Sequence, residues 1–308
     1  MPISPSKVFA IIVSHNGSTW ICQAIKSLQQ SICPVHIIVV DNVSTDETVE
    51  IVRSSYSDVM IFCMSSNLGF GAANNQGIRY AVSQGADYVF LLNQDARVAP
   101  ETIGNLVDLM QEKPAFGILS PLQLDYHGSG IDRSFVPYLQ ENDLLLTDVF
   151  LGKLQGVYEV SFVNAAVWLV SRSVLESVGG FDPLFFMYGE DNDYCSRVRY
   201  RGFKIGIAPK TLAWHRCIGP PRPKPAFFAL TNRFYIQTIH LLKRPDRFFL
   251  RNIPGLCITW LRMALHACIE CDFKRACAVL ISLLKTISML GKIWTHYRVC
   301  KRSLRPWL

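Results

Sequence analysis

Residues 8–17 read VFAIIVSHNG, and residues 35–42 read VHIIVVDN. Each stretch is a continuous run of β-branched and aliphatic residues that ends in polar side chains. Two further apolar runs follow, over residues 59–65 and 88–93. Short continuous runs of this kind are typical of strands that are buried on both faces of a sheet.

Helical patterns lie between these four predicted strands, over residues 19–30, 46–55 and 71–84. Alternation of strand and helix predicts an α/β fold with a mainly parallel central sheet and right-handed crossovers. Ligands of such folds bind at the carboxyl ends of the strands. The polar clusters of this half each follow a predicted strand: His15–Asn16, Asp41–Asn42, Asn67 and Asn93–Asp95.

The second half is less regular. Residues 125–156 are polar and rich in turn formers, which indicates an insertion or flap. We expect a strand within 160–170, a helix starting near Glu190 and a strand over 204–208, followed by a breaker-rich linker at Pro220–Pro225. Helices are predicted from there to the end of the chain.

These patterns predict two regions. Residues 1–222 form the main domain, of which 1–124 is the first half and 125–222 the second. Residues 223–308 form a basic, amphipathic helical region. We find no internal repeat.

Charge is distributed unevenly over the 308 residues. The net charge is +7, but residues 240–308 contain thirteen Lys/Arg and three Asp/Glu, which leaves the remainder at −3. A near-neutral body with a basic, apolar tail does not indicate a nucleic-acid-binding protein. It indicates an enzyme whose helical end docks on a surface. Basic residues interrupt the apolar runs of this tail, so we expect its helices to lie at a membrane interface; packing on the catalytic domain or a homo-oligomer interface are the alternatives.

The N-terminal residues enter a strand pattern without the features of a secretory signal, and no apolar run reaches the roughly 18 residues of a spanning helix. The ten cysteines are scattered, which suggests reduced thiols in the cytosol. Cys268 and Cys271, near Cys277 and His266, could bind zinc. Packing of small side chains on a helix is favoured, because there is no second C-x-x-C.

Two acidic segments are candidates for catalytic chemistry. Asp95 is the last residue of the strand segment YVFLLNQD at residues 88–95. The simpler alternative for Asp95 is a role in a turn or a helix cap. Glu190, Asp191 and Asp193 follow the apolar run FFMY at residues 185–188. A partly apolar pocket there would raise the pKa of a carboxyl group towards the range of a general base. A favourable position at a helix N-terminus is the simpler alternative, and Asp193 could simply pair with Arg197.

Other motifs restrict the choice of enzyme class. Gly69 and Gly71 are not placed as in a dinucleotide-binding loop, and no P-loop motif occurs. A sugar nucleotidyltransferase would need a basic Gly-rich loop after the first strand, whereas residues 14–18 read SHNGS. His215 follows a strand-like segment and is either a structural residue or a ligand.

Taken together, the motifs resemble those of family 2 glycosyltransferases with the GT-A fold, particularly bacterial rhamnosyltransferase-like members. The resemblance covers about Val8 to Gly219 and rests on six segments in this order: IIVSHNG, VVDNVSTDET, NLGFGAANNQGI, DYVFLLNQDARV, GGFDPLFFMYGEDNDYCSRVRYRGF and WH.

The resemblance implies roles for individual residues in binding the donor. Asp41 corresponds to the residue that binds the nucleotide base, with Ser44 and Asp46 shaping its loop. The other wall of the nucleoside site would come from Ser14, His15 and Asn16. The segment that closes over the nucleotide would contain Asn67, Gly69 and Asn74.

The resemblance also implies the residues of the reaction. Asp95 corresponds to the last aspartate of the family's D-x-D motif, whose first position is Asn93 here, with Gln94 between them. His215 would complete a site for Mn²⁺ or Mg²⁺ with Asp95. Asp191, next to Glu190, would be the base that takes the proton of the acceptor hydroxyl in a single, inverting displacement.

The expected function is transfer of a sugar from a nucleotide diphosphate donor to a cell-surface glycan or lipid-linked oligosaccharide. The rhamnosyltransferase resemblance favours L-rhamnose from dTDP-rhamnose, as in O-antigen biosynthesis. UDP- or GDP-linked donors and a non-catalytic scaffold in a glycan-assembly complex are the alternatives. We expect the protein in the cytoplasm, peripheral at the inner face of the cell membrane.

Overall fold

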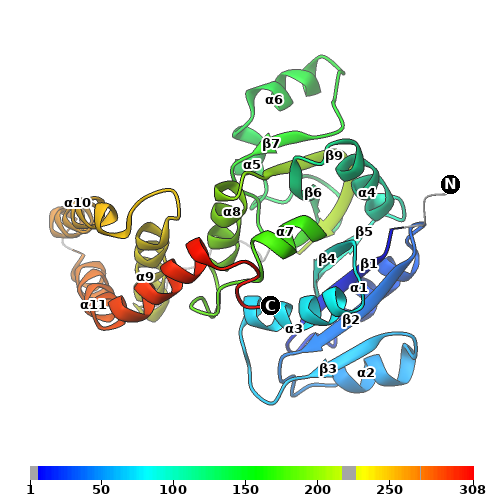
Figure 1. Cartoon of the computed structure of the whole chain (residues 1–308), viewed down its shortest axis with the longest axis horizontal. Coiled ribbons are helices and arrows are strands. Elements are labelled where there is room, and N and C mark those ends of the chain that lie inside the picture. Colours follow the sequence, from blue (N-terminus) through cyan, green and yellow to red (C-terminus); the bar gives the residue numbers. More distant parts are fainter. Residues whose placement is uncertain (1–5, 217–226, 271) are drawn as a thin grey trace.

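The computed structural model describes residues 6–216, 227–270 and 272–308. Figure 1 shows an α/β body and, beside it, a lobe made of the three helices nearest the end of the chain. The linker expected at 220–225 lies outside the described residues.

One nine-stranded sheet runs through the body in the order β3-β2-β1-β4-β8-β6-β9-β5, with β7 paired to β9. The strands are β1 (Val8–Ser14), β2 (Val35–Asp41), β3 (Met60–Cys63), β4 (Tyr88–Asn93), β5 (Ala96–Val98), β6 (Phe116–Asp125), β7 (Tyr158–Val160), β8 (Val167–Ser171) and β9 (Lys204–His215). Strands β1 to β4 are mutually parallel, and so are β6 and β9. Antiparallel β8 joins these two parallel sections.

Helices cover both faces of the sheet, as Figure 1 shows. One core contains side chains of α3, α7 and α8, and a second core on the opposite face contains side chains of α1, α2 and α4. The helices of the body are α1 (Ile21–Gln29), α2 (Thr48–Ser55), α3 (Phe70–Ser83), α4 (Thr102–Glu112), α5 (Val136–Gln140), α6 (Asp143–Phe150), α7 (Arg172–Ser177) and α8 (Glu190–Tyr200). The α/β fold predicted from the sequence is therefore confirmed.

Three segments differ from the expectation. The run at 160–170 is not one strand, because it is divided between the end of β7 and the start of β8. The segment 125–156, expected to be irregular, contains α5 and α6. Strand β9 continues beyond residue 208 to His215, past an irregularity at residues 209–211 where its register with β6 shifts. Pro209 lies in this interruption, where the ladder does not need its missing N–H.

The lobe consists of α9 (Phe227–Lys243), α10 (Phe249–Ile269) and α11 (Phe273–Arg302). Helix α11 is long and apolar enough to cross a membrane by length and composition, contrary to the expectation that no segment is. The cysteines whose side chains are described have free thiols. The side chains of Cys268 and Cys271 lie outside the described part of the chain, so the zinc hypothesis remains a prediction.

Candidate active site

The polar residues predicted at the strand ends do converge in the fold. Strand β1 lies between β2 and β4, so their carboxyl ends are neighbours. Gln94 links two of these ends: its Oε1 accepts hydrogen bonds from Ser14 Oγ at 2.7 Å and from the His15 N–H at 3.0 Å. Its amide group donates in turn to the His15 carbonyl at 3.2 Å. These contacts fix the loop after β1 against the loop after β4.

The loop after β2 packs against the loop after β1. Asn16 receives a hydrogen bond from the Thr45 N–H at 2.8 Å and donates its own N–H to Ser44 Oγ at 2.9 Å. Asp41 is 3% exposed, and its Oδ2 accepts from the Ser44 N–H at 3.1 Å. Its other oxygen, Oδ1, is buried without a hydrogen-bond partner. A buried carboxylate oxygen without a donor is costly, so it marks a position where a ligand N–H would bind.

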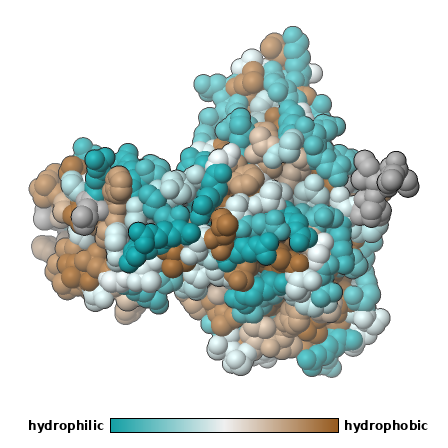
Figure 2. Space-filling model, in the orientation of Figure 1, coloured by the Kyte–Doolittle hydropathy of each residue, from teal (hydrophilic) through white to brown (hydrophobic). Residues whose placement is uncertain are grey.

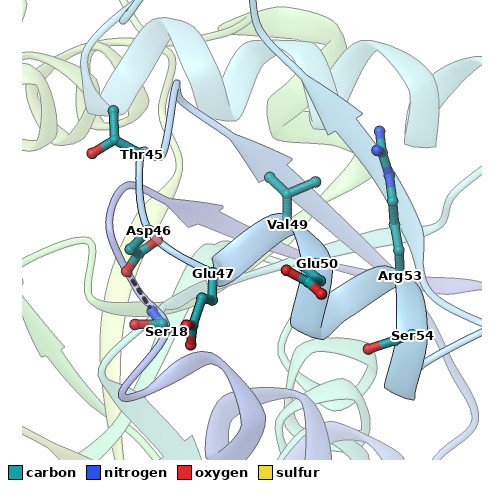
Figure 3. Close-up of a pocket in the computed structure, with 8 residues that line it drawn as sticks. All are labelled: Ser18, Thr45, Asp46, Glu47, Val49, Glu50, Arg53 and Ser54. Atoms are coloured by element: carbon teal, nitrogen blue, oxygen red, sulfur yellow. Dashed lines mark hydrogen bonds between the residues drawn. The ribbon is translucent and has the colours of Figure 1, made fainter.

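An open cavity of about 860 Å³ adjoins this loop. Figure 3 shows Asp46 hydrogen-bonded to Ser18 at its edge, with Glu47 and Glu50 further along α2. Burial acts to raise the pKa of Asp46, but hydrogen bonds from Thr48 and Ser18 outweigh it and lower the pKa to about 2. This acidic cavity would repel a diphosphate, and its lining does not include Asp95 or Asp191. Asp46 therefore shapes the loop.

Asn42 is a member of this cluster that sequence reasoning left without a role. It donates to Asn67 Oδ1 at 2.8 Å and accepts from the Leu68 N–H at 2.8 Å. The signal was available, since Asn42 directly follows Asp41 at the strand end. Asn67 also accepts from the Gly69 N–H at 2.9 Å. Asn74 lies one turn into α3 and donates to the Phe70 carbonyl at 3.0 Å, so its predicted contact with the donor remains a prediction.

Gly69 brings this loop against the segment before the acidic residues. Its φ is +77°, and a Cβ at this position would meet the Phe186 carbonyl oxygen at 1.9 Å. The Phe70 N–H donates to that same carbonyl at 3.2 Å. Any side chain at residue 69 would therefore separate the loop that follows β3 from the segment that carries Glu190 and Asp191.

A second cluster contains the predicted metal ligands. His215, at the end of β9, pairs in register with Ala96 of β5, which places its ring beside Asp95. The His215 Nε2 atom lies 3.7 Å from Asp95 Oδ1 and 3.4 Å from Asn93 Nδ2. Its other ring nitrogen, Nδ1, lies 2.9 Å from Asp132 Oδ2. A carboxylate at Nδ1 favours the tautomer with the proton there, which leaves the Nε2 lone pair directed towards Asp95.

This donor set fits a divalent cation. A carboxylate and an imidazole nitrogen face the same point and could bind the cation. The second carboxylate lies behind the imidazole, as in metal sites where such a group orients the histidine ligand. Asp132 is fully buried. Burial acts to raise its pKa, but hydrogen bonds from His215 and Ser134 outweigh this and lower the pKa. Sequence reasoning missed Asp132, because it lies in the segment expected to be a flap and 83 residues from its partner.

Glu190 and Asp191 begin helix α8 after a sharp turn. Tyr188 and Gly189 have φ values of +69° and +87°, so the helix starts directly at the two acids. Burial, with the charge of Asp191 added, raises the pKa of Glu190 to about 8. Burial also raises the pKa of Asp191, against hydrogen bonds from Asn192 and Ala165. Glu190 Oε2 is buried without a partner, whereas Asp191 Oδ1 accepts from the Asn192 N–H at 2.8 Å. These contacts favour the charge on Asp191 and the proton on Glu190.

The segment before β8 connects the two clusters. Its Ala166 carbonyl accepts from the Asn93 N–H at 2.9 Å, and its Ala165 makes a backbone hydrogen bond to the Asp191 carboxylate. Burial, then the charges of Asp191, Cys195 and Asp132, raises the pKa of Tyr138 to about 12. Tyr138 therefore lies close to both the acid of α8 and the carboxylate behind His215. The 165–166 segment and Tyr138 thus lie between the two clusters.

Asp193, the third acid, has a structural role. It pairs with Arg197 at 2.9 Å, as the alternative interpretation predicted, and with Lys243 of α9 at 2.7 Å. Lys243 also pairs with Asp182, whose other oxygen lies 2.6 Å from His296 of α11. Asp182, Asp193 and Cys300 lie close enough together to suggest a cation site. The Lys243 ammonium already supplies the positive charge there.

The sequence is similar to several proteins of known activity. It is 30% identical over 211 residues to a low-salt glycan biosynthesis hexosyltransferase of Haloferax volcanii, which covers 67% of this chain and 66% of that protein. It is 28% identical to a dTDP-rhamnosyl transferase of Shigella flexneri, over 68% of this chain and 69% of that protein. An O-antigen chain rhamnosyltransferase of Salmonella typhimurium is 28% identical over 80% of this chain and 83% of its own length. The chain thus matches about two thirds or more of these relatives.

Solved structures confirm the predicted GT-A fold. A mannosyltransferase of Pyrobaculum calidifontis in complex with GDP-Man and Mn²⁺ matches with a TM-score of 0.59 at 16% identity, covering 97% of this chain and 88% of that one. S. aureus TarS in complex with UDP-GlcNAc matches with a TM-score of 0.59 at 14% identity, over 96% and 91% of the two chains.

The sequence model of glycosyl transferase family 2 matches residues 9–179, more than half of the chain. The match contains Asp41, Asp95 and Asp132, and it ends before the acids of α8. The matched segment, the strand-end cluster and the relatives agree, and the chain belongs to glycosyltransferase family 2.

Proposed function

We propose that this chain is an inverting glycosyltransferase with Asp191 as the base and a divalent cation bound by Asp95 and His215. The donor is a nucleotide diphosphate sugar, and the acceptor is a hydroxyl group of a cell-surface glycan or lipid-linked oligosaccharide. One observation supports the proposal most: Asn93 and Asp191 both hydrogen-bond to the 165–166 segment, so one short segment contacts both clusters.

The nucleoside would bind at the ends of β1 and β2. The unpartnered Oδ1 of Asp41 suits the ring N–H that thymine, uracil and guanine present and that cytosine lacks. L-Rhamnose from dTDP-rhamnose is the proposed donor, supported by the similarity to rhamnosyltransferases of Shigella and Salmonella. UDP- and GDP-linked sugars remain the alternatives within the same site chemistry.

The diphosphate would lie at the second cluster. Asp95 and His215 would hold Mn²⁺ or Mg²⁺, which neutralises the charge that develops on a departing diphosphate. Asp132 would hold the His215 ring in place through Nδ1, so that Nε2 faces the cation. Asn93 replaces an acidic residue found at this position of the D-x-D motif, so the chain supplies one negative charge less and an amide near the same point.

The acceptor would approach α8. Asp191 would take the proton of the attacking hydroxyl, while Glu190 keeps its own proton near neutral pH. The base must lie within about 3 Å of that hydroxyl oxygen. Because a single displacement from the opposite face inverts the configuration, no second nucleophilic carboxylate is needed.

The proposed setting is the cytoplasmic face of the cell membrane. The basic helical lobe would bring the enzyme to a lipid-linked acceptor there, and self-association of the lobe is the alternative use of the same surface.

Two measurements test the proposed function. A thermal-shift screen of nucleotide sugars with Mn²⁺ should identify a donor, since bound ligand raises the unfolding midpoint with its occupancy. The variant Asp191→Asn should keep that shift and lose turnover by at least about 100-fold. Asp143→Asn, an exposed acid at the start of α6, is the matched control. Full turnover by Asp191→Asn would refute its role, and the absence of any donor shift would favour a scaffold.

A further inference from the structure

Two helices of the lobe expose apolar side chains along one side. On α11 these are Phe273, Leu280, Leu284 and Ile287, with exposed fractions between 54% and 81%. On α10 they are Ile258, Leu261, Leu265 and Ile269, between 53% and 82%. Spacings of three, four or seven residues place each set on one face of its helix. We call these eight residues the apolar face. Figure 2 shows exposed hydrophobic residues on this lobe, away from the α/β body.

The opposite side of α11 is committed to protein contacts. Ala278 and Val279 pack with Phe234 of α9, and Ile293 packs in a cluster with Ile239 of the same helix. Ser282 and Thr286 are buried on this side at 0% and 1% exposure. A helix that crosses a bilayer alone is surrounded by lipid, whereas α11 has one protein face and one apolar face. Its geometry is that of a helix lying in the plane of an interface.

The charge of the helix pair decides what covers the apolar face. Residues 249–302 contain nine Lys/Arg and two Asp/Glu. Helix α11 itself carries seven of these cations and no acid. Two copies of this surface facing each other would bring the same positive charges together, which costs free energy. A bilayer that contains anionic lipid provides opposite charge around the same apolar surface.

The turn between α9 and α10 combines an exposed aromatic ring with several cations, which suits a position at the level of the lipid headgroups. Phe248 is 67% exposed, with the Arg251 guanidinium 5.5 Å and the Lys301 ammonium 5.4 Å from its ring centre. A cavity of about 550 Å³ lies here, lined by Asp246, Arg247, Phe248, Arg251 and Pro254. An aromatic ring among cations suits the boundary between lipid headgroups and acyl chains.

We propose that the apolar face of α10 and α11 docks in the plane of an anionic lipid bilayer, with the surrounding arginines and lysines on the headgroups. This inference rests on the proposed membrane setting and names the surface that makes it. Lys243 joins the lobe to Asp193 of α8, and His296 joins it to Asp182 in the segment before α8, so docking would also hold Glu190 and Asp191 at a fixed position relative to the lipid.

Flotation of the full-length protein with lipid vesicles tests the proposal. The wild-type chain should float with vesicles of phosphatidylcholine containing about 30% phosphatidylglycerol, and less so with pure phosphatidylcholine or at high salt. The double variant Leu280→Asp/Leu284→Asp should bind the anionic vesicles at least about tenfold more weakly. Phe150→Asp is the control, because Phe150 is 88% exposed on α6, away from the lobe.

Three readouts keep the outcome unambiguous. Unfolding midpoints of both variants should match the wild type, since the changed residues are exposed. The thermal shift with a nucleotide sugar should persist in the double variant, which separates failure of docking from failure of donor binding. A double variant that floats like the wild type would overturn the proposal. So would a wild type that ignores both vesicles and instead forms dimers that the double variant abolishes on size exclusion.

Discussion

Glu190 and Asp191 are adjacent, yet their surroundings favour different protonation states. Asp191 is held by hydrogen bonds from Asn192 and Ala165, whereas one oxygen of Glu190 has no partner. A carboxyl group that is buried without donors keeps its proton, and a neighbour with donors carries the charge. Two adjacent acids at one helix start can thus supply one base without placing two negative charges in a buried site.

This difference predicts how stability depends on pH. The unfolded chain releases the Glu190 proton near its ordinary pKa of 4.5, whereas the folded chain keeps it up to about 8. Folding therefore loses stability as pH rises between these values and not below them. We expect Glu190→Gln to be more stable than the wild type at about pH 9, by roughly 3–5 kcal/mol, and equal to it at about pH 4.

Urea unfolding at both pH values measures this difference. Glu112→Gln, an exposed acid at the end of α4, is the matched control and should show no such dependence. An equal effect of Glu190→Gln at both pH values would mean that ionisation of Glu190 is not what changes stability.

Asp132 predicts a second effect at the level of one residue. Its carboxylate holds the Nδ1 side of His215, so Asp132→Asn loosens the orientation of the ring without removing a proposed ligand. We expect the affinity for Mn²⁺, measured by calorimetric titration, to fall about 10- to 100-fold. Asp108→Asn on the exposed side of α4 should leave it unchanged. Unaltered Mn²⁺ affinity in Asp132→Asn would place the cation elsewhere.

Helix α8 is the element on which the site depends most. Its N-terminus carries the two acids, and one turn later Asp193 ties it to Lys243 of the lobe. Gly189 allows α9 to approach, since a Cβ there would meet Ile236 Cγ2 at 2.5 Å. The buried pairs neutralise Asp193, so its charge does not add to those of Glu190 and Asp191.

Removing the Lys243 ammonium of α9, which pairs with Asp193 of α8, leaves buried negative charge uncompensated. The Lys243 side chain is 1% exposed and contacts both Asp182 and Asp193, so we expect Lys243→Met to lower the free energy of unfolding by about 3–5 kcal/mol. Lys292→Met, at an exposed position of α11, is the control. Urea unfolding at neutral pH checks both variants. If they behave alike, the buried cluster does not support α8.

Elements with a strong local pattern could be predicted, and others could not. Strands β1, β2 and β4 have the bounds that their continuous apolar runs indicated. A strand is also expected within 160–170, but residues 161–166 are not part of a strand and β8 begins only at Val167. Gln123 binds Asn164 there at 3.0 Å, a contact across 41 residues that no local pattern contains.

At the scale of the whole molecule, site residues too could be predicted only where a local sequence pattern marks them. The resemblance and the strand-end rule led to the proposal of Asp41, Asp95 and Asp191 as site residues, because each follows or precedes an element with a clear pattern. Asp132 and Lys243 were not predicted, because their hydrogen-bond partners lie 83 residues and 50 to 61 residues away in the sequence. Asp132 and His215 meet only once the body is folded, and Lys243 reaches its partners only once the lobe packs against the body.

The segment after α11 completes this packing by returning to the body. The Pro306 carbonyl accepts from the Gly180 N–H at 2.9 Å, and the Trp307 carbonyl accepts from Arg79 of α3 at 3.3 Å. The Trp307 ring lies 5.0 Å from the Arg197 guanidinium and 5.6 Å from the Lys243 ammonium. It also stacks on His296 at 5.9 Å. One ring thus covers the buried ion pairs that join the lobe to α8.

The loss of this ring should weaken the whole assembly. We expect Trp307→Ala to lower the free energy of unfolding by on the order of 3 kcal/mol, through lost packing and lost cation–π contacts. Trp307→Phe should recover part of it, because a smaller ring still covers the cations. Leu304→Ala, 69% exposed in the same segment, should change it by less than about 0.5 kcal/mol. Urea unfolding followed by circular dichroism measures all three, and equal values for Trp307→Ala and Leu304→Ala would show that residues 304–308 do not hold the lobe to the body.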